Sequence, residues 1–212
     1  TSSARGGGIA MSLFPLFLKL EGRQCLVVGA GNVAQSKIRS LLDSGANVRV
    51  IAPQANAAVE EWASAGVITW EARSFEVADL DETVLVIAAT SSSAVNGTVF
   101  REAQQRNILC NAVDDPEHCD FYYGAVVRRG QLQVAISTEG QSPALAQRIR
   151  RELEAQFGPE YAGWVEELGQ IRERLFASGI DPESRRQLLH ELASRDAFAE
   201  RESQAREKSY GR

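Results

Sequence analysis

The chain has 212 residues, of which 44% are hydrophobic, and its formal net charge is −5. This length and composition suit one large core with a smaller attached unit. The acidic balance argues against a general nucleic-acid binder. No apolar run approaches the roughly 18 residues needed to cross a membrane. We therefore expect neither a nucleic-acid partner nor a membrane span.

The first residues and the cysteines bear on location. Residues 1–10 are rich in Gly and Ser, and we interpret them as an added or upstream extension outside the fold. The apolar stretch 13–18 is short, contains Pro15 and lacks a small-residue cleavage site after it, which argues against a signal peptide. The three cysteines have no metal or redox spacing and are typical of reduced thiols in a cytoplasmic protein. They are Cys25, Cys110 and Cys119.

Residues 24–34 carry the clearest local pattern. A short apolar run ends at Gly29-Ala30-Gly31, and a helical pattern begins at once. Gly29 allows a tight turn, Gly31 leaves room for a phosphate beside the backbone, and Ala34 is small enough for close helix–strand packing. The free N–H groups of such a helix start suit an anion. We predict a dinucleotide-binding turn, the alternative being a strand–helix turn without a ligand.

Strand and helix patterns alternate up to about residue 113. The continuous apolar run 84–89 is typical of a central parallel strand buried on both faces. Strands that alternate with helices predict an α/β fold, a Rossmann-like, doubly wound parallel sheet with right-handed crossovers. After the glycine turn, the expected strands are 47–52, 67–71, 84–89 and 108–113, and the expected helices are 54–65 and 94–106.

The pattern changes near residue 120. The β-rich runs 121–128 and 132–137 flank Arg129-Gly130-Gln131 and predict a hairpin. Ser142-Pro143 then begins a helix, with Ser142 as its N-cap. Helical patterns continue from Tyr161 and restart at Asp181-Pro182, and we expect the charged last dozen residues to form a frayed tail.

Ligands of a doubly wound sheet collect beyond the carboxyl ends of its strands. The second strand ends at Pro53-Gln54 without the usual ribose-binding acid, so Gln54 or the backbone at Pro53 must hold the adenosine ribose. The fourth strand ends at Thr90, a candidate hydrogen-bonding group beside the cofactor. We interpret the serines at 91–93 as an ordinary helix N-cap.

The fifth strand ends at Asp114-Asp115-Pro116, which taken alone is a turn former. Asp114, however, would lie at the carboxyl edge of the sheet, where a nicotinamide ring would reach. A carboxylate there could remove a proton as hydride leaves the neighbouring carbon. His118 and Cys119 are metal-binding residue types. Because adjacent residues rarely share one coordination sphere and no further His or Cys pair completes it, we predict no dedicated metal site.

The loop 137–143 leads into a helix that carries Arg148, Arg150 and Arg151. Hydroxyls and free N–H groups at a helix start suit an anionic ligand. A basic cluster in an acidic protein is a plausible docking site for a polycarboxylate. The alternatives are simple capping by Ser142 and a solvated arginine face.

Taken together, five segments resemble the precorrin-2 dehydrogenase family, which is the N-terminal module of siroheme synthases and also occurs as a stand-alone protein. The segments are 14–18, 27–34, 87–90, 111–116 and 135–146, and the resemblance covers about residues 13–157. It implies NAD-dependent oxidation of precorrin-2 to sirohydrochlorin in siroheme biosynthesis. In some members the same cleft also inserts ferrous iron.

The resemblance also assigns roles to residues. The family's carboxylate, credited with roles in both steps, falls on Asp114. A hydroxyl residue that is phosphorylated in some relatives falls on Thr138, but Glu139 follows it where the family commonly has Gly, and that extra negative charge argues against a modification. With Ser142 and Arg148, which we expect from the helix start and the basic cluster described above, Thr138 completes the expected substrate-binding residues. The family's cofactor contacts fall on Gly29, Gly31, Asn32 and Val33, and on Pro53 and Gln54.

Family members are homodimers built through the region after the Rossmann domain. The resemblance therefore implies a small α+β dimerisation region at 121–157. Together with the strand and helix patterns above, we expect an NAD-binding Rossmann domain at 11–120 and a helical domain with a tail at 158–212.

Two other interpretations stay open beside a simple NAD-dependent dehydrogenase. One is a bifunctional enzyme that is also a ferrochelatase; the tetrapyrrole would supply the nitrogen ligands, so the protein would need no complete metal site. The other is a module that senses NAD without chemistry. Such modules usually keep the ribose-binding acid that this chain lacks.

Overall fold

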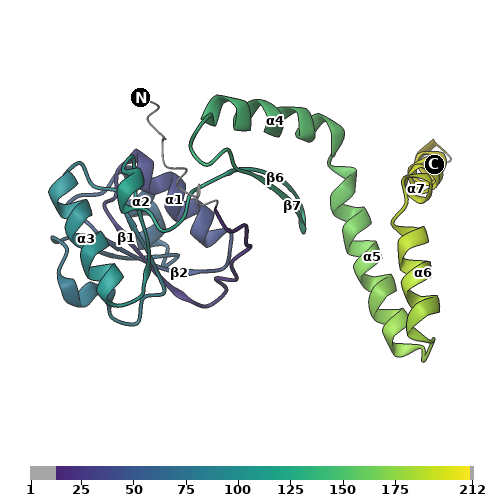
Figure 1. Ribbon diagram of the computed structural model, residues 1–212, viewed down its shortest axis with the longest axis horizontal. Helices are drawn as coiled ribbons and strands as arrows, with labels where there is room; N and C mark the ends of the chain where they lie inside the picture. Colours follow the sequence, from purple (N-terminus) through teal and green to yellow (C-terminus); the bar gives the residue numbers. More distant parts are fainter. Residues whose placement is uncertain (1–12, 211–212) are drawn as a thin grey trace, which may run out of the picture. The chain divides into compact units, whose positions relative to one another are not determined.

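The computed structural model describes the backbone of residues 13–210 and the side chains of 13–201 and 203. The extension expected at residues 1–10 lies outside this range. The chain divides into two compact units at Tyr123 and Gly124 (Figure 1). None of the helices in the described range is long and apolar enough to cross a membrane.

The first unit is built on a five-stranded parallel sheet of order β3-β2-β1-β4-β5. Strand order reverses between β1 and β4, and the carboxyl ends of strands at such a switch point form the ligand crevice of doubly wound folds. The predicted Rossmann-like sheet is therefore confirmed. The strands are β1 (Gln24–Val28), β2 (Asn47–Ile51), β3 (Thr69–Glu71), β4 (Leu85–Ala88) and β5 (Leu109–Ala112).

Helices cover both faces of this sheet. On one face, α1 (Asn32–Leu42) and α2 (Ala57–Ser64) bury their apolar residues against Val27 and Val48. On the other face, α3 (Ser93–Gln105) and the 3₁₀ helix η1 (Val77–Leu80) pack on residues of the central strands. Strands whose residues are buried on both faces read as continuous apolar runs, which is why they could be predicted.

A network of four charged side chains fixes the edge of the sheet. Arg49 of β2 donates to Glu71 of β3 and to Asp79 of η1, both at 2.7 Å. Arg73 also pairs with both carboxylates. The side chain of Asp79 is only 3% exposed, and its second oxygen accepts the Glu76 N–H at 2.8 Å. Burial opposes ionisation of Asp79, but the hydrogen bonds and the two guanidinium groups outweigh it and hold its pKa below the usual range.

The second unit begins with an antiparallel hairpin of β6 (Ala125–Arg129) and β7 (Leu132–Ile136). The predicted hairpin is confirmed, with Gly130 in the left-handed conformation of its turn. Helix α4 (Pro143–Gln156) packs on β6, and Ser142 caps it as predicted by accepting the Leu145 N–H.

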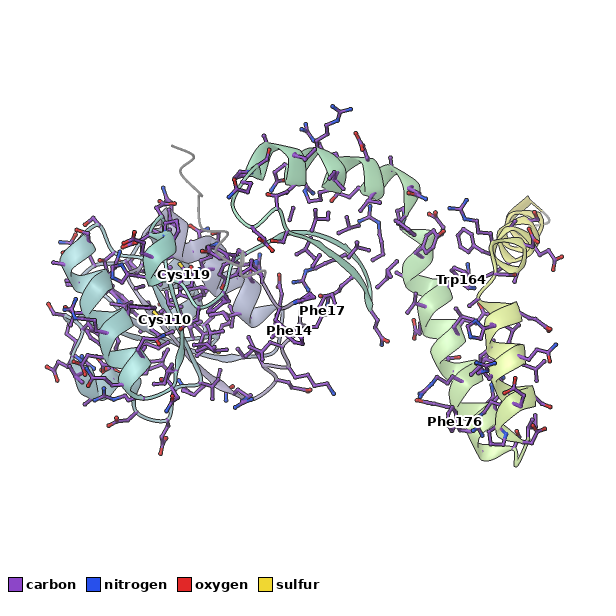
Figure 2. All side chains as sticks on the ribbon, viewed as in Figure 1. Phe14, Phe17, Cys110, Cys119, Trp164 and Phe176 are labelled. Atoms are coloured by element: carbon purple, nitrogen blue, oxygen red, sulfur yellow. The ribbon has the colours of Figure 1, made fainter. Side chains whose placement is uncertain are left out.

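Three further helices complete the second unit: α5 (Glu160–Ala177), α6 (Pro182–Leu192) and α7 (Arg195–Tyr210). Trp164 of α5 (Figure 2) lies with its ring centre 4.6 Å from that of Phe198 in α7, and Tyr161 stacks on the same ring. The last dozen residues were expected to fray, but α7 is helical through Tyr210. Its packing on α5 through Phe198 gives this helix a support that its charged sequence does not reveal.

We predict that Asp79→Asn destabilises the first unit by about 3 kcal/mol at pH 7, because it leaves two guanidinium groups short of a carboxylate. Asp79 has a lowered pKa when folded, so its contribution is complete above the unfolded pKa of about 4 and is lost as the pH falls through the lower folded value. The difference in the free energy of unfolding between the variant and the wild type should therefore be smaller in acid. Urea unfolding at pH 7 and pH 3 measures it.

Glu102→Gln is the matched control, since it removes a carboxylate from the i,i+4 pair with Arg106 on α3. Such a helix-surface pair contributes about 0.5 kcal/mol or less. Equal losses for the two variants would contradict the structural role assigned to Asp79.

Candidate functional site

The two glycines of the turn after β1 meet different requirements. Gly29 has a φ of +109°, and a Cβ there would lie 2.4 Å from the carbonyl oxygen of Ala89, at the end of β4. Gly31 has ordinary extended angles, and a Cβ there would meet nothing within 4 Å. Gly29 is therefore required by the protein itself, whereas the space at Gly31 is open to a ligand.

The N-terminus of α1 is left free to bind that ligand. Gly31 is its N-cap and makes no side-chain cap, and the first intrahelical bond runs from Gln35 N–H to Gly31 at 2.9 Å. The amides of Asn32 and Val33 precede that bond, and both residues are exposed. Ala34 is fully buried, as the third small position of a dinucleotide-binding turn requires. These residues fit the pyrophosphate of a dinucleotide.

Asn56 is a site residue that sequence reasoning missed. Its N–H donates to Ala30 at 3.0 Å, and its side-chain amide donates to Asn32 and to Gln35. Its side-chain oxygen accepts the Val59 N–H and so caps α2. The helix predicted to begin at Gln54 therefore begins at Ala57, and Asn before a helical pattern was the available N-cap signal. Asn56 ties the glycine turn to the next helix.

The loop after β2 contains no acid. Pro53 and Gln54 are both exposed, and the carbonyl of Ala52 is held by the Trp70 indole N–H at 3.0 Å. The nearest strand-end carboxylate, Glu71, is occupied by Arg49 and Arg73, whose hydrogen bonds lower its pKa. The structure thus leaves the backbone at Pro53 and the Gln54 amide as the available ribose contacts on this strand.

Thr90 lies at the end of β4, beside the glycine turn, but its hydroxyl is used locally. It donates to Asn96 Oδ1 at 2.7 Å and accepts the Ser92 N–H at 3.2 Å. Asn96, buried and missed by sequence reasoning, also donates to the Thr90 carbonyl. Ser92 caps α3 as expected for this serine run. The geometry favours a structural role for the Thr90 hydroxyl and leaves its backbone to border the cofactor site.

Asp114 follows β5 at the same edge of the sheet. Val113 N–H donates to Ala88 at 2.9 Å, which ties this residue to the end of β4, and β4 in turn pairs with β1. Asp114 is exposed and has a φ of +60°, a left-handed conformation that is uncommon for residues other than glycine. Within the described range, its carboxylate makes no hydrogen bond or ion pair. It is a free base on the edge that carries the glycine turn.

The residues after Asp114 are engaged in structure. Asp115 accepts from His118 Nδ1 at 2.6 Å, which agrees with its predicted role in shaping the turn. The thiol of Cys119 donates to the Ala112 carbonyl at 3.1 Å, and burial raises its pKa. No group of three metal-ligating side chains exists in the part of the chain that the structure describes.

The chain then turns back along β5. Asn111 and Cys119 form an antiparallel bridge, and the side chain of Asn111 donates to the Phe121 carbonyl at 2.8 Å. The carboxylate of Asp120 accepts the Cys110 N–H at 2.8 Å. These bonds cover the open edge of β5 and fix the strand from which Asp114 emerges.

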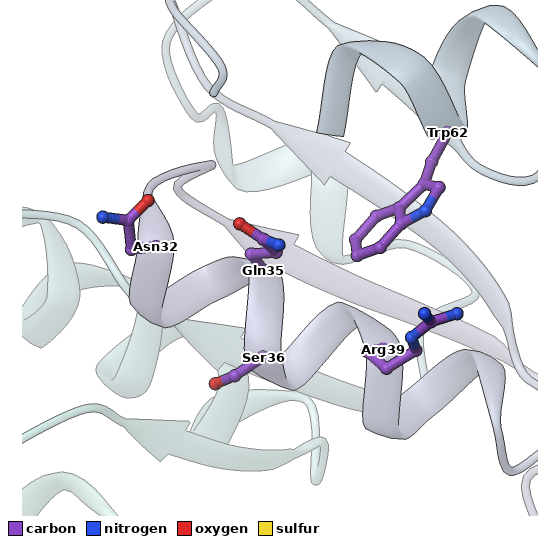
Figure 3. Close-up of a pocket in the computed structure, with 5 residues that line it drawn as sticks. All are labelled: Asn32, Gln35, Ser36, Arg39 and Trp62. Atoms are coloured by element: carbon purple, nitrogen blue, oxygen red, sulfur yellow. The ribbon is translucent and has the colours of Figure 1, made fainter. Parts of the chain in front are cut away.

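A shallow groove of about 340 Å³ extends from Asn32, at the start of α1, over α1 and α2 (Figure 3). In it the guanidinium of Arg39 lies 5.6 Å from the ring centre of Trp62. The groove is lined by Asn32, Gln35, Ser36, Arg39 and Trp62. Apart from Asn32, none of these is a predicted site residue.

The predicted substrate-binding residues belong to the second unit and have partners within it. Thr138 Oγ1 accepts the Ser142 N–H at 3.1 Å, and Ser142 Oγ accepts the Leu145 N–H at 3.3 Å. Glu139 has a φ of +51°, a left-handed conformation that glycine adopts without strain. Arg148 pairs with Glu152 at 2.8 Å on the exposed face of α4. The structure supports the capping interpretation of Ser142 and leaves the three binding roles as predictions.

Two family models and several curated relatives match the chain. Residues 16–125 match the family described as Putative NAD(P)-binding, and residues 129–156 match the family described as Sirohaem biosynthesis protein central. Siroheme synthase 1 of Serratia proteamaculans (strain 568) is 41% identical over 174 residues, which are 80% of this chain and 36% of that protein. The siroheme synthase of Photobacterium profundum is 40% identical over 183 residues, 86% of this chain and 39% of that protein.

The chain thus spans well under half the length of these relatives. A solved structure described as SirC, precorrin-2 dehydrogenase, is similar over 86% of this chain and 90% of that chain, with a TM-score of 0.74 and 28% sequence identity. The chain belongs to the putative NAD(P)-binding family, and its predicted resemblance to siroheme synthases and precorrin-2 dehydrogenases is confirmed.

Proposed function

We propose that this protein catalyses the NAD-dependent dehydrogenation of precorrin-2 to sirohydrochlorin. One observation carries the proposal: the free helix N-terminus at Gly31 and the carboxylate of Asp114, which has no partner among the described residues, lie at the same edge of the sheet. The similarity of this protein to a solved precorrin-2 dehydrogenase structure, which extends over 90% of that structure's chain, supports the choice of substrate. The siroheme synthase relatives support a role in siroheme biosynthesis. We place the protein in the cytoplasm.

The cofactor is NAD rather than NADP. Its pyrophosphate binds the amides of Asn32 and Val33, and its ribose contacts Pro53 and Gln54. A 2′-phosphate needs a free guanidinium near the ribose. The two arginines near the ends of β2 and β3, Arg49 and Arg73, are already neutralised by Glu71 and Asp79.

Oxidation removes a hydride and a proton from the macrocycle. Bound NAD supplies the hydride acceptor. Asp114 accepts the proton: it is exposed, makes no hydrogen bond in the described range, and is rigidly placed by the Val113 bond to β4. The proton then passes from Asp114 to solvent.

The second unit supports a homodimer built through residues 121–157. Strands β6 and β7 pair only with each other within the described residues, so each has an open edge. A lone two-stranded hairpin is marginally stable, and a second copy would extend the sheet and cover these edges. Thr138, Ser142 and Arg148 are assigned to the polycarboxylate substrate.

Insertion of ferrous iron into the product is a second candidate activity. The pyrrole nitrogens lose protons when iron binds, and Asp114 is free to accept them. The iron is a substrate here and needs no cluster of protein ligands.

The function is tested by following NADH absorbance with precorrin-2 and NAD, with and without ferrous iron. NADH formation supports the dehydrogenase, and siroheme formation above the uncatalysed rate supports the second activity. Stoichiometric NAD binding without NADH formation would instead indicate a module that senses NAD.

We predict that Asp114→Asn lowers the rate of NADH formation at least about 100-fold, since general-base catalysis typically contributes that much. Asn tolerates the left-handed conformation of this position, so the fold should be kept. The dissociation constant for NAD, measured by calorimetry, should stay within twofold. Glu117→Gln, which neutralises an exposed carboxylate close by in the chain, is the control and should retain wild-type activity. Full activity of Asp114→Asn would rule out the proposed base.

We predict that Gly31→Ala lowers NAD affinity without lowering stability, whereas Gly29→Ala lowers stability. A methyl group at Gly31 enters open space, so the melting temperature should stay the same while NAD affinity falls about tenfold or more. A methyl group at Gly29 collides with Ala89, so the melting temperature without cofactor should fall. Thermal unfolding and NAD titration of both variants separate the effects. Unchanged NAD affinity in Gly31→Ala would contradict the assigned pyrophosphate site.

A further inference from the structure

Lys37 is a half-buried cation on α1 that none of the chemistry above uses. It lies one turn beyond the glycine turn, and its Nζ sits 3.6 Å from the centre of the Tyr123 ring. Among the residues that the structure describes, no carboxylate comes within ion-pair distance of it. A half-buried ammonium ion held only by an aromatic face has lost hydration without gaining an anion.

The group with which Lys37 interacts electrostatically is Asp114. Burial lowers the pKa of Lys37, and the negative charge of Asp114 acts in the opposite direction. Cys119 is the other titratable group near it, but burial raises the pKa of that thiol, so it is neutral at pH 7. The ammonium and the carboxylate therefore share one region of the first unit without closing into a pair.

An anionic ligand bound beside Asp114 would give the ammonium of Lys37 the counter-ion that it lacks among the described residues. We propose that Lys37 binds a peripheral carboxylate of the tetrapyrrole substrate and so positions the macrocycle against Asp114. The inference rests on the proposed function, because that function supplies both the polycarboxylate and the role of Asp114. The Tyr123 ring holds the cation in place, which limits the freedom of an otherwise flexible side chain.

Two features favour a substrate carboxylate over a cofactor phosphate. The amides at the start of α1 already form a phosphate site, and Lys37 lies beyond them along the helix. The carboxylate with which Lys37 interacts electrostatically is Asp114, the proposed base, which takes its proton from the substrate. Binding energy at a group remote from the reacting carbon serves to orient that carbon.

The test compares Lys37→Met and Lys37→Arg with wild type. Lys37→Met should raise the KM for precorrin-2 about tenfold, as expected for loss of a charge-assisted contact, and should also lower kcat, because the macrocycle is held less precisely against Asp114. Lys37→Arg keeps the charge and should stay within about threefold of the wild-type KM. The melting temperature and the dissociation constant for NAD should be unchanged in both. Arg39→Met is the matched control, because it removes a cation from the same helix, over the groove of Figure 3, and should leave KM unchanged.

Direct titration of sirohydrochlorin, followed by absorbance, provides a readout that does not depend on turnover. Weaker binding in Lys37→Met than in wild type and Arg39→Met supports the inference. An unchanged KM and unchanged titration would overturn it, as would an equal loss in Lys37→Arg or a matching loss of NAD affinity. A wild-type protein that binds sirohydrochlorin but forms no NADH would instead count against the proposed function.

Discussion

The close approach of Gly29 to the backbone of Ala89 is the constraint on which the site depends. It brings the turn after β1 against the end of β4, the two strands between which the sheet reverses its order. Only a residue without a Cβ allows this approach, and only glycine adopts its φ of +109° without strain. Because Val113 is bonded to Ala88, the same contact determines where Asp114 lies relative to the start of α1.

Charge is distributed over the first unit in two different ways. At the edge of the sheet, Arg49, Arg73, Glu71 and Asp79 form a closed network in which each group faces an opposite charge. Where β1 and β5 end, the positive end of α1 and the carboxylate of Asp114 remain open, and the ammonium of Lys37 lies on α1 within electrostatic reach of Asp114. A closed network stabilises the fold and attracts no ligand, whereas open charges in a partly desolvated place interact strongly with whatever enters.

Much of this fold could be predicted from the sequence because its determinants are local. Continuous apolar runs marked β1 and β4, and the glycines marked the turn. Asn56 was missed although an Asn before a helical pattern is an N-cap signal, and its bonds to α1 leave no signal in the sequence. Asn96 was missed because its amide bonds to Thr90 in the preceding loop have no periodicity. The contact of Lys37 on α1 with Tyr123 joins residues 86 positions apart in the chain, and the pairing of Arg49 with the buried Asp79 is also non-local. Thr90 was assigned by position, which could not reveal that its hydroxyl was already used.

The distinction between satisfied and unsatisfied polar groups separates the structural residues from those that await a ligand. Folded proteins leave few polar groups without partners once they are removed from water. Asp115, His118, Thr90 and Ser142 all have partners within their own unit, so their conformations are explained by folding alone. For the amides of Asn32 and Val33, the ammonium of Lys37 and the carboxylate of Asp114, the described residues provide no such partner. The left-handed backbone of Asp114 and the half-buried ammonium of Lys37 each cost the free protein some stability, and we propose that a bound substrate recovers part of that cost.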